Sequence, residues 1–122
     1  MSTVAIPSEQ WSDFLAAFSR RHAGWLVTLD THDFDTGERV SSEFKSLESI
    51  ELDLEDASNP RINVLVRSEN KEIKHILFRP SRLALHVSRD GTEEAIQIES
   101  VNTSTTVRLR VAIQPELVDG VA

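Results

Sequence analysis

Residues 82–99 read RLALHVSRDGTEEAIQIE, and this stretch decides the fold class. Apolar and polar side chains alternate on both sides of the dipeptide Asp90-Gly91. Such alternation is typical of a β-strand with one buried face, and Asp-Gly is typical of the type I′ turn, whose two central residues both need a positive φ. The stretch therefore predicts an antiparallel hairpin that is joined by a two-residue turn.

The two-residue turn also predicts the register of this hairpin. It places Leu83 opposite Ile98 on one face and Arg82 opposite Glu99 on the other. Apolar residues then meet apolar residues and opposite charges meet each other, as favourable cross-strand pairs do. Since a slip of one residue would turn every side chain to the wrong face, the pairing is strongly specified.

A period of two continues over most of the chain outside the hairpin. Turn-forming stretches interrupt it, among them DFDTG at 33–37 and DASNP at 56–60. The resulting segments predict an antiparallel sheet of about seven strands, followed by a short tail at 115–122. The segments are 25–31, 39–47, 50–55, 61–67, 72–79, 82–89, 92–101 and 105–112.

Segment 72–79 differs from the others because it is apolar on both faces. Ile73 and Leu77 point one way, and Ile76 and Phe78 point the other way. A strand with two apolar faces is typical of the covered centre of a sheet. We therefore expect this strand to be central, with a helix over one face and the curled sheet over the other.

One helix precedes the strands, at 8–22, with Ser8 as its expected N-cap and Gly24 just after its last turn. Its apolar residues recur with the spacing of one helical face; they are Trp11, Phe14, Leu15 and Phe18. The whole chain, 1–122, is then a single α+β domain that is predominantly β. In this domain an N-terminal amphipathic helix packs on a curled antiparallel sheet, which approaches a partly open barrel.

Composition and charge narrow the choice of partners. The formal net charge of −7 opposes binding to nucleic acid or to anionic membranes, both of which require clustered basic residues. No apolar segment reaches the length of a membrane span, and the first residues lack the pattern of a secretory signal. The chain has no cysteine, which fits a reducing compartment. We expect a cytoplasmic monomer or homodimer whose partner is a protein or a small ligand.

Motifs for catalysis and cofactor binding are missing from the sequence. There is no Gly-x-Ser-x-Gly, and the four glycines form no phosphate-binding loop. Residues 33–44 begin like a calcium loop, but the glycine comes one position early and Phe44 stands where the closing glutamate is needed. No two histidines have the spacing of a metal site. We therefore predict no catalytic residue, no metal site and no cofactor.

Four residues remain as candidates for a ligand site, namely His22, Trp25, His75 and Arg79. His75 lies on an apolar strand face, where burial lowers the pKa of an imidazole and demands a hydrogen-bond partner. His22 is in the last helical turn, where basic side chains already interact with the helix dipole. The Trp25 ring either locks the helix to the sheet or marks a ligand groove. A structural role is thus open for these residues beside the functional one.

Several stretches together resemble a family of small, uncharacterised bacterial proteins, the domain of unknown function DUF5335. They are Ile6-Pro7 through Trp11, FSRRHAGWLVTL at 18–29, His75 followed by Pro80 and Leu85, EAIQIES at 94–100, TVRLR at 106–110 and PELVDG at 115–120. The resemblance covers nearly the whole chain. It departs at 101–104, where this chain has VNTS and the family pattern places Asp-Gly. The family has no assigned activity, so the resemblance implies no catalytic residue.

Three functional hypotheses follow. The leading one is a non-enzymatic binding or protein-interaction domain, because catalytic motifs are missing and a curled sheet offers an edge and a concave face. The second is a small enzyme or metal-dependent protein that uses His75 or His22 with nearby carboxylates, which can meet only in the fold. The third is a homo-oligomeric structural protein. A concave site of about 300 Å³ or more would favour the first.

Overall fold

The computed structural model describes residues 2–110, which form one large antiparallel sheet of nine strands, a short 3-10 helix and one α-helix. The predicted α+β class, with mostly β structure, is confirmed. The tail at 115–122 and the end of the predicted strand 105–112 lie outside the described residues. The elements are β1 (Ser2–Ile6), η1 (Ser8–Gln10), α1 (Trp11–His22), β2 (Leu26–Asp33), β3 (Arg39–Ser41), β4 (Lys45–Asp53), β5 (Arg61–Ser68), β6 (Lys71–Phe78), β7 (Arg82–Val87), β8 (Glu93–Ser100) and β9 (Thr103–Leu109).

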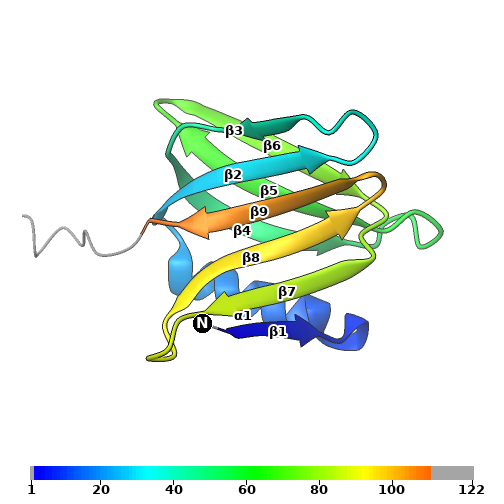
Figure 1. The fold of residues 1–122 in the computed structure, drawn as a ribbon, viewed down its shortest axis with the longest axis horizontal. Coiled ribbons are helices and arrows are strands. Elements are labelled where there is room, and N and C mark those ends of the chain that lie inside the picture. Colours follow the sequence, from blue (N-terminus) through cyan, green and yellow to red (C-terminus); the bar gives the residue numbers. More distant parts are fainter. Residues whose placement is uncertain (1, 111–122) are drawn as a thin grey trace, which may run out of the picture.

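The sheet curls over itself and stays open. Its strand order is β1-β7-β8-β9-β2-β4-β5-β6, with β3 added beside β2, so β1 and β6 end the path and the sheet is not closed into a barrel. Strand β2 pairs along its length with β9 but with β4 at only two positions, where the sheet folds back. Strands β1, β7, β8, β9, β2 and β3 therefore make one layer, and β4, β5 and β6 make a second layer behind it (Figure 1).

The predicted register of the β7–β8 hairpin is confirmed, but the predicted two-residue turn is wrong. Leu83 lies opposite Ile98, as expected. The loop instead closes at Ser88 and Thr92, whose backbone groups bond at 2.9 Å, and Gly91 has a φ of 87° while Asp90 is not among the residues with positive φ. A bulge beside Val87 compensates for the longer turn and restores the register beyond it.

The strand boundaries near the start of the sheet differ from the expectation. The predicted segments 39–47 and 50–55 are wrong, because β3 ends at Ser41 and β4 runs without a break across the gap between them. A bulge in β4 shifts its register against β5 between Leu47 and Ser49. The bulge breaks the alternation of apolar and polar side chains, so the sequence pattern does not show that the strand is continuous. Strand β1, short and mostly exposed, was not predicted.

Strand β6 lies at the edge of the sheet, so the central position predicted for 72–79 is wrong. It pairs with β5 alone, and the helix packs mainly against β4 rather than over β6. Ile73 and Leu77 are partly buried against the core, as predicted, but Ile76 and Phe78 are 38% and 55% exposed. The second apolar face of this strand is therefore open to solvent.

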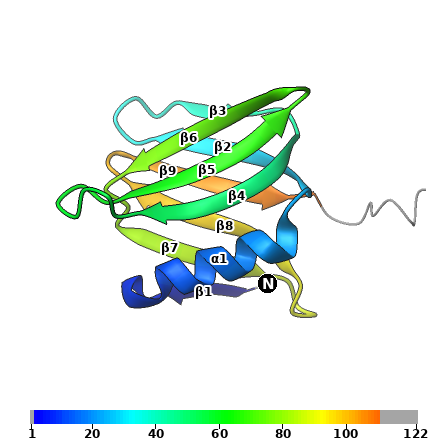
Figure 2. The same cartoon turned by 180° about the vertical axis from the view of Figure 1, so that it is seen from behind.

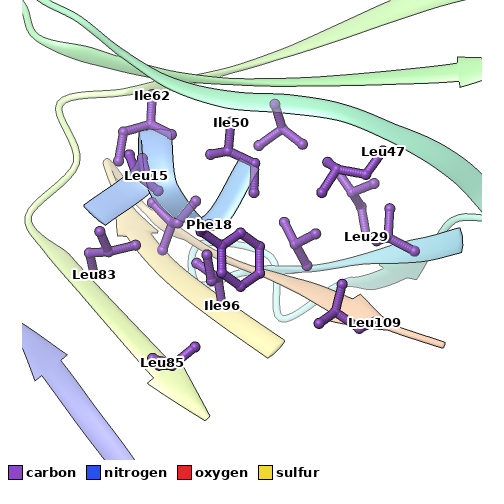
Figure 3. Close-up of a cluster of buried hydrophobic side chains, with 14 of the residues drawn as sticks. Leu15, Phe18, Leu29, Leu47, Ile50, Ile62, Leu83, Leu85, Ile96 and Leu109 are labelled. Carbon is purple, nitrogen blue, oxygen red and sulfur yellow. The ribbon is translucent and has the colours of Figure 1, made fainter. Parts of the chain in front are cut away.

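Helix α1 fills the space between β4 and the other layer (Figure 2). The α-helix begins at Trp11, after a 3-10 turn, and Ser8 makes no capping hydrogen bond, so the predicted N-cap is wrong. Its predicted apolar face is confirmed: Leu15 and Phe18 are fully buried and Trp11 nearly so. Figure 3 shows Phe18 between side chains from both layers, including Ile50 and Ile96.

Ser19 joins the helix to the backbone of β4. Its hydroxyl oxygen accepts a hydrogen bond from the Ile50 amide at 2.8 Å, and its hydroxyl group donates one to the Ile50 carbonyl at 3.1 Å. Beyond Ser46, β4 has no strand partner on this side, because its pairing with β2 has ended. One helical serine thus satisfies two backbone groups that a neighbouring strand would otherwise satisfy.

We expect Ser19→Ala to lower the free energy of unfolding by about 2 kcal/mol, because it leaves a partly buried N–H and C=O without partners. Urea denaturation checks this value. Ser12→Ala, an exposed serine of the same helix, is the matched control and should change the stability by no more than about 0.5 kcal/mol. Equal effects of the two substitutions would contradict the role assigned to Ser19.

Candidate functional site

A cavity of about 520 Å³ opens where β6 ends beside the β8–β9 turn. Both lie at the right-hand end of Figure 1, where the Val101 amide donates a hydrogen bond of 3.2 Å to the Phe78 carbonyl across the two layers. The apolar part of the lining consists of Ile76, Leu77, Phe78 and Val101. This volume lies in the range of typical ligand sites. We call it the β6-end cavity.

Hydroxyl groups line the rest of the β6-end cavity. Thr31 comes from β2, Thr103 and Thr105 come from β9, and Ser100 ends β8. The hydroxyls of Ser100 and Thr103 bond to each other at 2.7 Å. Thr105 is only 1% exposed, and its Oγ1 has no hydrogen-bond partner among the described residues. The cavity therefore combines an apolar wall with a polar group whose bonding capacity is unused.

Arg79 lies at the rim of this cavity, just after the last residue of β6. Its φ of 48° is in the left-handed region, which is uncommon for a residue other than glycine. Its amide donates to the Pro60 carbonyl, and its Nε donates to Oδ1 of Asn59 at 3.1 Å. It also lines an adjoining hollow of about 290 Å³ with Asp56 and Arg61. Arg79 thus lines both depressions.

A second polar group lies at the other end of the fold, where the last turn of α1 meets the start of β8. Glu93 accepts hydrogen bonds from His22 Nε2 at 2.8 Å and, in a two-pronged contact, from Arg21 at 2.8 to 3.1 Å. Burial of Glu93 opposes its ionisation, but the bonds from His22 and Arg21 outweigh burial and lower its pKa. His22 is 7% exposed and packs against the rings of Phe18 and Trp25. The imidazole of His22 is thus buried by packing, whereas the Arg21 side chain remains half exposed.

The four predicted site residues do not come together. Arg79 alone lines the β6-end cavity. His22 and Trp25 contact each other, with ring centroids 4.7 Å apart, and Trp25 packs against the core. His75 faces the interior from the edge strand β6, opposite Val64. None of these three lines the cavity, so the geometry separates Arg79 from the other candidates.

The imidazole of His75 is partly buried on the inner face of β6. Burial, and to a smaller extent the charge of Lys45, lowers its pKa, and its Nε2 is buried without a hydrogen-bond partner among the described residues. The folded protein then binds a proton on His75 less readily than the unfolded chain, whose imidazole has a pKa of about 6.5. Its contribution to stability is complete above that pH and is lost as the pH falls through the folded pKa.

We therefore expect the free energy of unfolding to fall as the pH drops below about 6.5, and His75→Leu to flatten this part of the profile. Urea denaturation of both proteins at a series of pH values measures the slope. If the variant keeps the slope of the parent protein, a group other than His75 is responsible for it.

Metal binding and membrane crossing find no support in the described part of the chain. Within residues 2–110, no three side chains of His, Cys, Asp or Glu gather closely enough to hold a metal ion. The single α-helix of this described part is too short and too polar to cross a membrane.

Comparison with known proteins gives a family. Residues 2–116 match the family of unknown function named DUF5335. The chain belongs to this family. One relative is an uncharacterised protein from Aquifex aeolicus (strain VF5), which is 25% identical over 114 residues, covering 93% of this chain and 96% of the relative. No solved structure shows a significant match. Family membership therefore indicates no function, and the site must be judged by its geometry.

Proposed function

We propose that this DUF5335 protein is a non-enzymatic binding domain that holds a small, largely apolar ligand in the β6-end cavity. The observation that carries the proposal is the cavity itself, with a volume of about 520 Å³ and an apolar wall that includes Leu77 and Val101. Burial of an apolar ligand there would gain roughly 25 cal/mol for each Å² removed from water. The function is binding without chemistry, as the lack of catalytic motifs also suggests.

The exposure of the cavity rim supports the same function. Phe78 and Val101 are each more than half exposed, although they are large apolar side chains. Exposed apolar side chains that gather at one depression are typical of binding sites, whereas isolated ones need no explanation. A ligand in the cavity would cover part of this surface. Binding is therefore expected to stabilise the folded protein.

The enzyme hypothesis has less support. His22, whose ring is packed between two aromatic side chains, already bonds to Glu93 through Nε2. His75 has a buried Nε2 but no carboxylate bonded to it in the described chain. Neither imidazole lines the β6-end cavity. A general base must reach the proton that it removes, and these two positions offer no such path from the cavity.

Titration with decanol, followed by heteronuclear NMR of the full chain, tests the proposal. The expected result is that amide signals at 76–79 and 100–105 shift together and saturate. Val101→Trp places a large ring at the exposed rim and should weaken binding by about tenfold or more. Val40→Trp is the matched control, because Val40 is equally exposed and lies outside the cavity lining. Shifts scattered over the surface, unchanged by Val101→Trp, would refute the proposal.

A further inference from the structure

The charges around the β6-end cavity are unlike those of the chain as a whole. The chain carries a formal net charge of −7, yet within residues 2–110 no carboxylate side chain lines the cavity. Among these described residues, Arg79 is the one charged side chain of the lining. In a cavity with low-dielectric walls, a single unopposed charge acts strongly on a bound ligand. The cavity is therefore a positively charged position in an acidic protein.

The guanidinium of Arg79 has donors to spare. A guanidinium carries five N–H donors, and the one on Nε is used by Asn59. Within residues 2–110 no carboxylate forms an ion pair with Arg79, although Arg21, Arg61, Arg67 and Arg108 each form at least one. Arg79 is exposed, and its bond to the neutral Asn59 side chain leaves its charge in place. A guanidinium fork matches the geometry of a carboxylate.

One carboxylate lies near Arg79, and it is engaged elsewhere. Asp56 lines the adjoining hollow rather than the β6-end cavity. Its oxygens accept hydrogen bonds from the side chains of Ser58 and Asn59 and from the Ser58 amide. These bonds, followed by the charge of Arg61, hold its pKa below the usual range. Asp56 thus orients Asn59, which in turn holds Arg79.

The backbone conformation of Arg79 also indicates that its side chain has a binding role. With a φ of 48°, this position would suit glycine better than arginine. Residues held in such conformations tend to occur at binding sites, where the side chain is required. The side chain at this position contributes one bond to Asn59 and a charge at the cavity rim.

We infer that the ligand of the β6-end cavity is an amphiphilic carboxylate, whose acid group binds the Arg79 guanidinium and whose apolar body lies against Leu77 and Val101. This inference rests on the proposed function and adds the chemical class of the ligand. The unpartnered hydroxyl of Thr105 lines the same cavity and is available to a second polar atom of the ligand. A neutral or cationic molecule of equal length would leave the Arg79 charge without a counterion.

Three probes that share the same alkyl chain distinguish the carboxylate inference from the proposed binding function. They are decanoate, decanol and decylamine, each titrated into the full chain by calorimetry and NMR. We expect decanoate to bind at least about tenfold more tightly than decanol, and decylamine to bind most weakly. Arg79→Gln should reduce decanoate binding by about tenfold and leave decanol binding unchanged. The matched control is Arg89→Gln, which removes the same charge from the exposed β7–β8 turn at the opposite end of the sheet (Figure 1).

The outcomes distinguish the inference from the proposed function. If the three probes bind equally, or if Arg79→Gln and Arg89→Gln act alike, the carboxylate assignment is wrong while the binding function stands. If none of the probes shifts the signals of the cavity lining, the proposed function itself fails. Thermal unfolding of each variant confirms that it is folded before binding is compared.

Discussion

Replacing Phe18 by alanine is expected to lower the free energy of unfolding by about 4 kcal/mol, because a fully buried phenylalanine leaves a large hole when it is truncated. Phe18 is the helical residue that lies between the two layers of the sheet (Figure 3). It belongs to one buried cluster with side chains of both layers, so its truncation leaves a hole between them. Since a domain of this size is stable by roughly 5 to 15 kcal/mol, the loss is severe.

A matched substitution distinguishes the loss of buried packing from the loss of an aromatic ring at the surface. Phe34 is 54% exposed and stacks only on His32, so Phe34→Ala should cost about 1 kcal/mol or less. Urea denaturation gives both values, and hydrogen exchange of the α1 amides shows whether the helix loosens first. A cost below about 1.5 kcal/mol for Phe18→Ala would mean that the helix does not hold the layers together.

The position of Phe18 could be predicted from the sequence because it depends on local spacing. Helical periodicity alone assigns Leu15 and Phe18 to one face, and both are fully buried. The pairing of Leu83 with Ile98 is equally local, since one short turn brings the strands together. Even in this hairpin the predicted two-residue turn was wrong, because the actual turn is longer and a bulge beside Val87 compensates for its length. Local patterns thus give faces and neighbours within one hairpin.

Long-range pairing could not be predicted in the same way. A period of two tells which side chains share a face, but it does not tell which strand lies next to which. Strand β6 therefore looked central because of Ile76 and Phe78, yet it is an edge strand that leaves both side chains exposed. These two residues line the β6-end cavity, so the strand whose position was predicted wrongly also forms part of the candidate site.

The candidate site could be predicted only in part. Arg79 was one of four predicted residues, and it lines the cavity. Thr105 and Val101 were missed, because a threonine in a strand and a valine in a turn carry no signal of their own. The cavity depends on β6 and β9 meeting across the layers, which no local pattern specifies.

The contact between Glu93 and the end of α1 was also beyond local prediction, because 71 residues separate Glu93 from His22. The carboxylate receives hydrogen bonds from the buried His22 and the half-exposed Arg21. With its hydrogen on Nε2, His22 loses its partner when Glu93 is removed, and a buried polar group is then left unsatisfied. Arg21 gains less from the contact because water surrounds its guanidinium.

Glu93→Ala is therefore expected to destabilise the fold by about 3 kcal/mol at neutral pH, and Arg21→Ala by about 1 kcal/mol or less. The pH dependence separates charge from packing. Because the folded state lowers the pKa of Glu93, its contribution is complete above the usual glutamate value and is lost as the pH falls through the folded pKa. Glu93→Gln should lack this acid-dependent part, as urea denaturation between neutral and acidic pH would measure. An unchanged profile in Glu93→Gln would show that the charge of Glu93 contributes nothing to the acid-dependent stability.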